Sequence, residues 1–222
     1  MSSNSTTHDV ADQPRIILLG PPASGKSTLF KSLSRIYPDI GHFSVRLFFE
    51  REKKLGTRWG ELAIPDERGW LPNLLVAEAA EMHIKQHAGR GFVMEGFPAS
   101  EEQAHLMNEM IRRNDFQIHG IIYLIVNEAT SISRANKRMV CDQCDNGVNN
   151  VDSENGLCPV CQTPLIKRFD DIGDRFINRL RLHQERIQRV IDILQLPAKT
   201  VNAEQRKEVV FQEVLNFLRK GV

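Results

Sequence analysis

The fold of this chain is decided by the segment Gly20-Pro21-Pro22-Ala23-Ser24-Gly25-Lys26-Ser27-Thr28. The segment follows an apolar run, Arg15-Ile16-Ile17-Leu18-Leu19, and precedes a helical pattern that starts at Leu29. A strand, a G-x-x-x-x-G-K-[ST] loop and a helix in this order form a phosphate-binding P-loop. Its glycines allow a wrap in which backbone N–H groups point at phosphate oxygens, and the helix start adds the positive end of its dipole. A chance glycine-rich turn is the alternative, but this full motif in its proper setting predicts a nucleoside triphosphate site.

Each polar residue of the loop has an expected role. The Lys26 ammonium reaches the β- and γ-phosphates, and the Ser27 hydroxyl ligates Mg²⁺. The residues predicted to bind the nucleotide here are Gly20, Ser24, Gly25, Lys26, Ser27 and Thr28.

The composition excludes several classes of protein. Lysine and arginine number 29 against 28 acidic residues in a chain of 222, so no broad field favours a nucleic-acid polymer or a membrane surface. No apolar run approaches the roughly 20 residues of a membrane span. The polar residues 1–13 lack an apolar signal-peptide core, and we expect a disordered tail there. Because the cysteines are confined to one segment, a cytoplasmic location is expected rather than a secreted disulfide framework.

Alternating apolar strands and helical patterns indicate an α/β fold with a doubly wound parallel sheet. Strands are predicted at 15–19, 41–45, 91–95, 120–126 and 199–202, and helices at 29–37, 46–55, 71–86, 128–138, 171–194 and 204–219, with another after Ser100. The continuously apolar run from Gly120 to Val126 is typical of a central strand covered on both faces. The long helix at 171–194 places Ile172 with Phe176 and Leu180 on its apolar side.

Three polar residues have expected positions in this pattern. Glu95 ends an apolar strand, and ligands of open α/β sheets bind at the carboxyl ends of strands. Glu95 is therefore expected to face the same crevice as the P-loop, with a structural capping carboxylate as the alternative. Ser100, with Gln103 three residues later, predicts a capping box at a helix start, and Asn127 predicts the cap of the next helix.

The four cysteines form two C-x₂-C pairs, Cys141 with Cys144 and Cys158 with Cys161. Two such pairs place four thiolates tetrahedrally around Zn²⁺, and the polar segment between them cannot build a core of its own. The spacing is slightly shorter than in most zinc ribbons, and redox dithiols or bare thiols are the alternatives. Four cysteine ligands leave no open position, so we predict a structural zinc site rather than a catalytic one.

With the P-loop, the segment Glu95-Gly96-Phe97-Pro98 and the four-cysteine insert in this order, the chain resembles the adenylate kinase family, and most of all its members with a zinc-binding lid. The resemblance extends from Arg15 to the C-terminus. It implies a P-loop fold with a five-stranded parallel sheet, ATP and Mg²⁺ as the donor, structural Zn²⁺ and a monomer. The implied division is a tail at 1–13, a core at 14–40, 78–138 and 169–222, an acceptor insert at 41–77 and a zinc lid at 139–168.

On the donor side, four arginines match the family. Arg134 and Arg138 lie where an R-x-x-G-R motif precedes the lid, although the glycine is replaced. Arg168 resembles the lid-exit R-x-D-D motif, and Arg179 falls on another phosphate-clamping arginine of the family. The resemblance implies that Lys26, Arg138, Arg168 and Arg179 stabilise the migrating phosphoryl group while Arg134 stacks on the donor base. A solvated surface explains each arginine singly, but not four at these spacings.

On the acceptor side, two phosphate-binding arginines of the family are missing. The family's H-x-S-T-G-D-x-x-R is here His42-Phe43-Ser44-Val45-Arg46-Leu47-Phe48-Phe49-Glu50, so Val45 replaces a base-contacting threonine and Glu50 replaces an arginine. In the family's D-G-F-P-R-x-x-x-Q, Glu95 replaces the aspartate and Ala99 the second arginine, while Gln103 is kept and can read an adenine edge. Glu50 repels a phosphate dianion unless Arg46 or Arg51 compensates. The predicted acceptor-binding residues are Val45, Arg46, Glu50, Gly96, Ala99 and Gln103.

Together these features predict a phosphotransferase that moves the γ-phosphate of Mg-ATP to a small-molecule acceptor, a hydroxylated metabolite or nucleoside. Glu95 is predicted either to orient a Mg²⁺-bound water or to accept the proton of the acceptor hydroxyl. The first alternative is a genuine adenylate or other nucleoside monophosphate kinase, with Arg46 or Arg51 as a substitute clamp. The second is a non-catalytic nucleotide-binding switch, which the intact donor arginines argue against.

Overall fold

A five-stranded parallel sheet forms the centre of the computed structural model, which describes residues 13–87, 89–141, 143, 147–149 and 155–220. Its strand order is β2-β3-β1-β4-β8. The strands are β1 (Arg15–Leu19), β2 (Gly41–Ser44), β3 (Phe92–Glu95), β4 (Gly120–Ile125) and β8 (Ala198–Asn202). This sheet confirms the predicted fold class. Glu95 is in register with Leu18 on one side and with Ser44 on the other, so three strands end at the same level.

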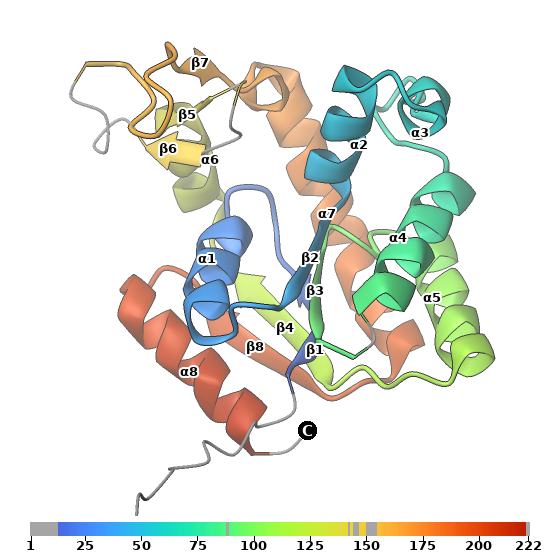
Figure 1. The fold of residues 1–222 in the computed structure, drawn as a ribbon. Coiled ribbons are helices and arrows are strands. Elements are labelled where there is room, and N and C mark those ends of the chain that lie inside the picture. The colour runs from blue at the N-terminus through green and yellow to red at the C-terminus, as the bar shows by residue number, and fades with distance from the viewer. Residues whose placement is uncertain (1–12, 88, 142, 144–146, 150–154, 221–222) are drawn as a thin grey trace, which may run out of the picture.

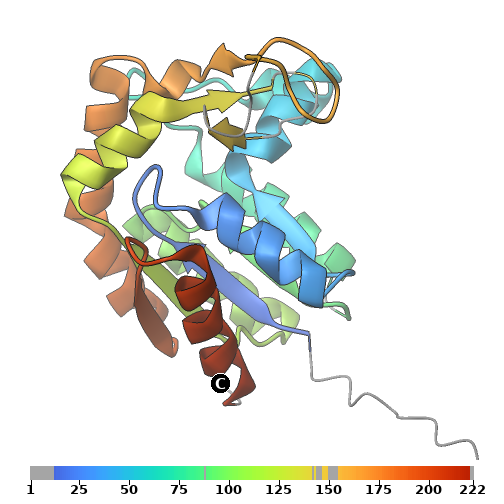
Figure 2. The same cartoon turned by 90° about the vertical axis from the view of Figure 1, so that its left-hand side faces the viewer.

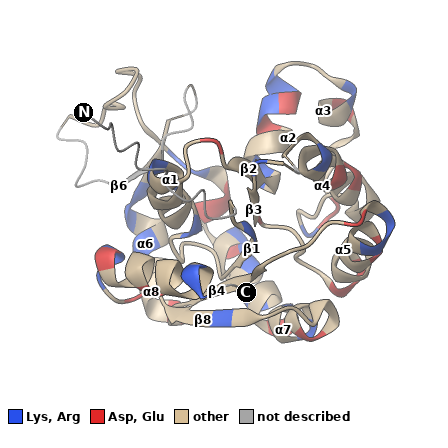
Figure 3. Cartoon of the chain, turned by 60° about the horizontal axis from the view of Figure 1, so that its bottom comes forward, with Lys and Arg blue, Asp and Glu red and all other residues tan. Residues whose placement is uncertain are grey.

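Helices cover both faces of the sheet (Figure 1). One face carries α1 (Lys26–Ile36) and α8 (Lys207–Arg219), and the other carries α4 (Asn73–His87), α5 (Glu101–Asn114) and α7 (Asp174–Leu194). The remaining helices are α2 (Val45–Lys54), α3 (Arg58–Leu62) and α6 (Glu128–Lys137). Acidic and basic residues are intermixed along α3, α4 and α5 (Figure 3), as expected from the balanced composition. Among the described helices, none has the length and apolarity needed to cross a bilayer.

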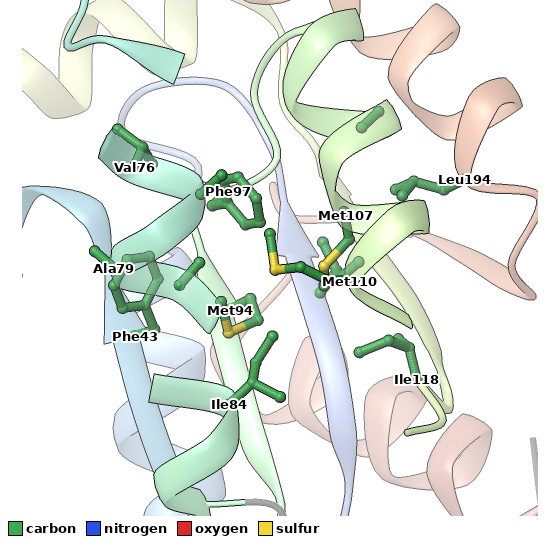
Figure 4. Close-up of a cluster of buried hydrophobic side chains, with 14 of the residues drawn as sticks. Phe43, Val76, Ala79, Ile84, Met94, Phe97, Met107, Met110, Ile118 and Leu194 are labelled. Atoms are coloured by element: carbon green, nitrogen blue, oxygen red, sulfur yellow. The ribbon is translucent and has the colours of Figure 1, made fainter. Parts of the chain in front are cut away.

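The core consists of two apolar layers, one on each face of the sheet. Successive residues of β1 alternate between them: Ile17 packs in the layer under α4, α5 and α7, and Ile16 in the layer under α1 and α8. Ile121 and Ile122 of β4 divide in the same way, which confirms that this strand is covered on both faces. Figure 4 shows the first layer, where Met94 lies among side chains of α4 and α5. Each fully buried aliphatic side chain contributes about 1.5–3 kcal/mol of hydrophobic free energy.

Side-chain caps start two helices where the sequence predicts them. The Ser100 Oγ accepts the Gln103 N–H at 3.2 Å, and the Asn127 side chain accepts the Thr130 N–H at 2.7 Å. The reciprocal half of the capping box differs, because the Gln103 side chain accepts the N–H of Ala99 at 2.8 Å.

A second, antiparallel sheet has the order β6-β5-β7 and consists of β5 (Arg138–Val140), β6 (Gly147–Asn149) and β7 (Ile166–Lys167). Figures 1 and 2 place it at the P-loop end of the main sheet, where α2 and α3 also lie. β2 is an edge strand of the main sheet, so the insert expected at 41–77 shares its first four residues with that sheet.

The predicted start of the long helix at Asp171 is wrong. Residues Phe169–Asp171 form a 3₁₀ turn, Gly173 has a φ of 60°, and α7 begins at Asp174. The side chain of Asp171 is buried and binds Arg138. This ion pair stabilises the 3₁₀ turn at a position where the sequence predicts the α-helix. Ile172, predicted on the apolar side of the helix, is therefore 47% exposed. The last helix likewise begins at Lys207 instead of Glu204.

Candidate active site

The P-loop has the backbone conformation that its glycines predict. Gly20 has a φ of 151°, and a Cβ atom there would lie 2.7 Å from Ser24 Oγ and 2.8 Å from the Leu124 carbonyl oxygen. Gly25 has a φ of 99° and directly precedes α1. Ala23 also has a positive φ, 60°, at a position where the resembled family has glycine. A non-glycine residue in this left-handed region is strained by about 1 kcal/mol.

The Lys26 ammonium binds the carbonyl oxygens of its own loop. Its Nζ donates to Gly20 O at 2.8 Å and to Pro21 O at 2.9 Å. Burial lowers its pKa to about 8, with further lowering by Arg179, Arg138 and Arg168, against the opposing charge of Glu95. A triphosphate in the loop supplies the negative charge that restores the ammonium form.

Glu95 faces the P-loop, as the sequence predicts. Its Oε1 accepts a hydrogen bond from the Ser27 hydroxyl at 2.9 Å, and its Oε2 lies 3.0 Å from Nε2 of His42. The His42 ring stacks on Phe30 of α1 with a centroid separation of 3.6 Å. Burial raises the pKa of Glu95, but the His42 hydrogen bond and the charge of Lys26 outweigh it and hold that pKa below the usual value. The carboxylate therefore stays ionised.

Arginines from the two ends of the segment that forms the small antiparallel sheet, and one from α7, face the same crevice. Arg138 binds Asp171 through two hydrogen bonds of 2.8 and 2.6 Å. Arg168 donates to Asp170 at 2.6 Å, and Arg179 lies 3.5 Å from the same carboxylate. Burial, Arg179 and Arg46 lower the pKa of Arg168 to about 10.

Two donors of this cluster, Nε of Arg168 and Nη1 of Arg179, are buried and form no hydrogen bond with the described residues. Unsatisfied buried donors are costly. Oxygens of a bound phosphoryl group would satisfy them.

The acceptor side of the crevice is formed by α2 and by the loop before α5. Arg46, in the first turn of α2, donates from Nη1 to Oε2 of Glu50 at 2.7 Å. Burial is the main cause of the lowered pKa of Arg179, and the charges of Arg138 and Arg46 add to the effect. Arg51, the other candidate clamp, binds Glu52 at 2.7 Å and is not among the residues that line the crevice, so the geometry favours Arg46 of the two.

Two further predicted binders already have protein partners. The Gln103 amide donates to Asn73 Oδ1 at 3.0 Å, in addition to its bond with Ala99. Arg134 donates to the carbonyl oxygen of Ala203 at 2.7 Å and lines the donor end of the crevice. Their contacts with adenine rings stay predictions.

A single cleft of about 780 Å³ joins these parts. At one end it is lined by the P-loop, Arg134, Ala203 and Phe211, and at the other by residues of the acceptor side. The acceptor-side lining includes Val45, Arg46, Glu50, Trp70, Gly96, Ala99 and Gln103. The structure thus brings together all the predicted nucleotide- and acceptor-binding residues from separate elements.

Three cysteines converge beside the small antiparallel sheet. The sulfurs of Cys141, Cys158 and Cys161 lie within 4.8 Å of one another, and those of Cys141 and Cys161 are 3.3 Å apart. Tetrahedral coordination with zinc–sulfur bonds of about 2.3 Å separates sulfurs by roughly 3.8 Å. The arrangement fits a zinc ion, while Cys144 lies outside the described residues.

His183 lines the cleft but was not predicted from the sequence as a site residue. His183 of α7 lines the cleft four residues after Arg179. Residues four apart share a helix face, so the position of Arg179 is the signal that points to it.

A P-loop with a lysine, a carboxylate facing its serine and convergent arginines define a P-loop phosphotransferase. A family model described as adenylate kinase matches residues 18–198. The chain is 31% identical to an adenylate kinase of Fervidobacterium nodosum, over 91% of this chain and 94% of that protein, and 30% identical to one of Thermosipho melanesiensis, over 92% and 99%. The chain therefore belongs to the adenylate kinase family.

Proposed function

We propose that the protein is a nucleoside monophosphate kinase that transfers the γ-phosphoryl group of Mg-ATP to a nucleoside monophosphate, with AMP as the first acceptor to test. The observation that carries the proposal is the single cleft that joins the P-loop to the acceptor side, with Arg46 in its lining and near enough to Arg168 for its charge to lower the pKa of that arginine in addition to the effect of burial. Relatives that match more than 90% of the chain are adenylate kinases. They support the monophosphate alternative rather than the hydroxylated acceptor first predicted, and an enzyme rather than a switch.

The donor residues act mainly by positioning and by electrostatics. Backbone N–H groups of the loop bind the phosphates, and Lys26 exchanges its carbonyl partners for phosphate oxygens. Arg168 and Arg179 direct their unsatisfied donors at the migrating group, whose charge spreads over three oxygens. Arg138, held by Asp171, adds positive charge from the lid boundary.

Ser27 and Glu95 are the residues that would hold Mg²⁺, directly or through water. Their oxygens are 2.9 Å apart, and hydroxyl and carboxylate oxygens suit this hard cation. The ion supplies charge neutralisation between the phosphates. His42 fixes the orientation of the carboxylate from the other side.

The acceptor phosphate is proposed to bind Arg46. Glu50, which stands in place of a family arginine, is half exposed and pairs with Arg46 at 2.7 Å. This pairing neutralises Glu50 and orients the guanidinium over the cleft. Arg46 thereby takes over a charge that the family places elsewhere on the same helix.

Arg46→Ala is expected to lower kcat/KM for the monophosphate by about 10- to 100-fold, because a charge-assisted hydrogen bond contributes about 1.5–3 kcal/mol. KM for ATP should change far less. Arg51→Ala is the matched control, since Arg51 lies on the same helix but pairs with Glu52 outside the cleft. Steady-state kinetics with both substrates varied measure the effect. Equal losses in the two variants would contradict the assignment.

The hydroxylated acceptor remains the rival to be tested. An acceptor hydroxyl needs a base whose pKa lies near the working pH, whereas the pKa of Glu95 is lowered. Release of ADP with each of the common nucleoside monophosphates, and with nucleosides and sugars, separates the two proposals. Turnover confined to compounds without a phosphate would overturn the monophosphate proposal.

We also propose that a structural zinc ion holds the lid, with Cys144 completing the ligands of the three described cysteines. The support is the convergence of their sulfurs around a core in which, among the described residues, Leu165 and Met139 are the other apolar side chains. Such a small domain depends on its metal for folding, by on the order of 10 kcal/mol.

Metal analysis of protein purified without chelators is expected to give one zinc per chain. Chelation should raise hydrogen exchange in β5 and β7 while the strands of the main sheet stay protected, because their apolar layers do not involve the lid. Less than half an equivalent of zinc, or unchanged exchange after the metal is removed, would contradict the proposal.

A further inference from the structure

His183 has no role in the reaction as described so far, yet its position in the cleft is unusual. Its Nε2 atom is buried and has no hydrogen-bond partner among the described residues. The ring lies 6.1 Å from that of Tyr123, measured between centroids. A buried ring nitrogen without a hydrogen-bond partner costs folding free energy. A ligand bound in the cleft would provide the missing partner.

The contacts of α7 place His183 between the arginine cluster beside the P-loop and the acceptor side of the cleft. One turn before it, Arg179 lies beside Asp170 at the donor phosphates. After it, the Cζ atom of Arg186 lies 4.9 Å from the centroid of the Trp70 ring. Arg189 forms an ion pair with Glu101, the first residue of α5, with 2.6 Å between Nη1 and Oε1. Trp70 lines the acceptor side of the cleft, and α5 begins just after the loop that carries Ala99.

The protonation state of His183 limits what it can bind. Burial, together with the charge of Lys26, lowers its pKa to about 3. The imidazole is neutral at physiological pH, with one N–H donor and one acceptor nitrogen. It can therefore donate a single hydrogen bond without adding charge to the arginine cluster.

We propose that His183 is an acceptor-positioning residue, whose Nε2–H donates a hydrogen bond to the phosphate of the nucleoside monophosphate. This inference rests on the proposed function. Ala99, in the loop before α5, also lines the cleft, and its methyl side chain cannot donate a hydrogen bond. His183 supplies a donor from α7 to the cleft that Arg46 also lines.

Three variants test the proposal. His183→Phe and His183→Leu remove the donor, and His183→Gln places an amide N–H near the position of Nε2. We expect the first two to raise KM for the monophosphate by about 5- to 20-fold, with KM for ATP within about twofold of the wild type. His183→Gln should recover most of the difference. Gln184→Ala, at an exposed neighbouring position, should leave both constants unchanged.

Thermal unfolding gives a readout that separates positioning from a structural role. Removing an unsatisfied buried nitrogen should leave Tm of His183→Phe equal to that of the wild type or higher. A lower Tm with parallel rises in both KM values would show a structural residue and overturn the inference. An unchanged monophosphate KM in the Phe and Leu variants would also overturn it, while the active wild type would still support the proposed function. Failure of the wild type with every monophosphate would overturn both.

Discussion

Lys26→Ala is expected to lower kcat by about 10³-fold, because its ammonium is placed to neutralise charge on the β- and γ-phosphates during transfer. Hydrogen bonds from Nζ to Gly20 O and Pro21 O hold the ammonium inside the phosphate-binding loop. Because the ammonium would also contact the phosphates of bound ATP, ATP affinity should fall as well. Lys199→Ala is the control. This lysine does not line the cleft, and its Nζ lies 3.9 Å from Oε2 of Glu213.

Stopped-flow measurement of a single turnover separates the two effects of Lys26→Ala. Saturating ATP should not restore the rate of phosphoryl transfer, because the lost interaction is strongest in the transition state. A variant that regains most of the wild-type rate at high ATP concentration would show that Lys26 acts only in binding.

Arg179→Ala is expected to lower kcat by about 10²- to 10³-fold while ATP affinity changes by less than about tenfold. Its Nη1 is buried without a hydrogen-bond partner among the described residues, and a planar charged donor of this kind stabilises the migrating phosphoryl group. The comparison of kcat with the directly measured Kd for ATP tests this asymmetry.

The matched control for Arg179→Ala is Arg181→Ala, which removes an exposed arginine two residues later on α7. Two residues along a helix place a side chain on a different face, so this variant should keep its activity. Equal losses in kcat and ATP affinity for Arg179→Ala would assign it to ground-state binding instead.

The P-loop was predictable because its residues are contiguous in the sequence, and the donor arginines were predictable because their spacing resembles motifs of the family. The P-loop residues are contiguous, and Glu95 ends a strand in register with Leu18 of β1, directly before the loop. The alternation of Ile16 and Ile17 between two apolar layers follows from the period of a strand. The strand order β2-β3-β1-β4-β8 depends on long-range contacts and was not predicted from the sequence.

The acceptor half was only partly predictable because it depends on contacts between elements. The sequence shows Glu50 as a charge reversal, but only the structure shows that Arg46 neutralises it at 2.7 Å. Helical spacing in α7 contains the signal for His183, but its buried unpartnered nitrogen is visible only in three dimensions. The prediction that the long helix begins at Asp171 was wrong because this residue lies in a 3₁₀ turn, where its carboxylate binds Arg138.

The measurement that tests the proposed function most directly is the reverse reaction with Mg-ADP as the sole nucleotide. A nucleoside monophosphate kinase breaks one phosphoanhydride bond and forms another, so the reaction is close to balanced and runs in both directions. We predict that ATP and AMP appear in equal amounts and that Lys26→Ala abolishes both. A kinase specific for hydroxyl groups forms a phosphate ester and has no second acceptor in this mixture. The assignment as a nucleoside monophosphate kinase is contradicted if ATP forms neither from ADP alone nor from ADP mixed with any other nucleoside diphosphate.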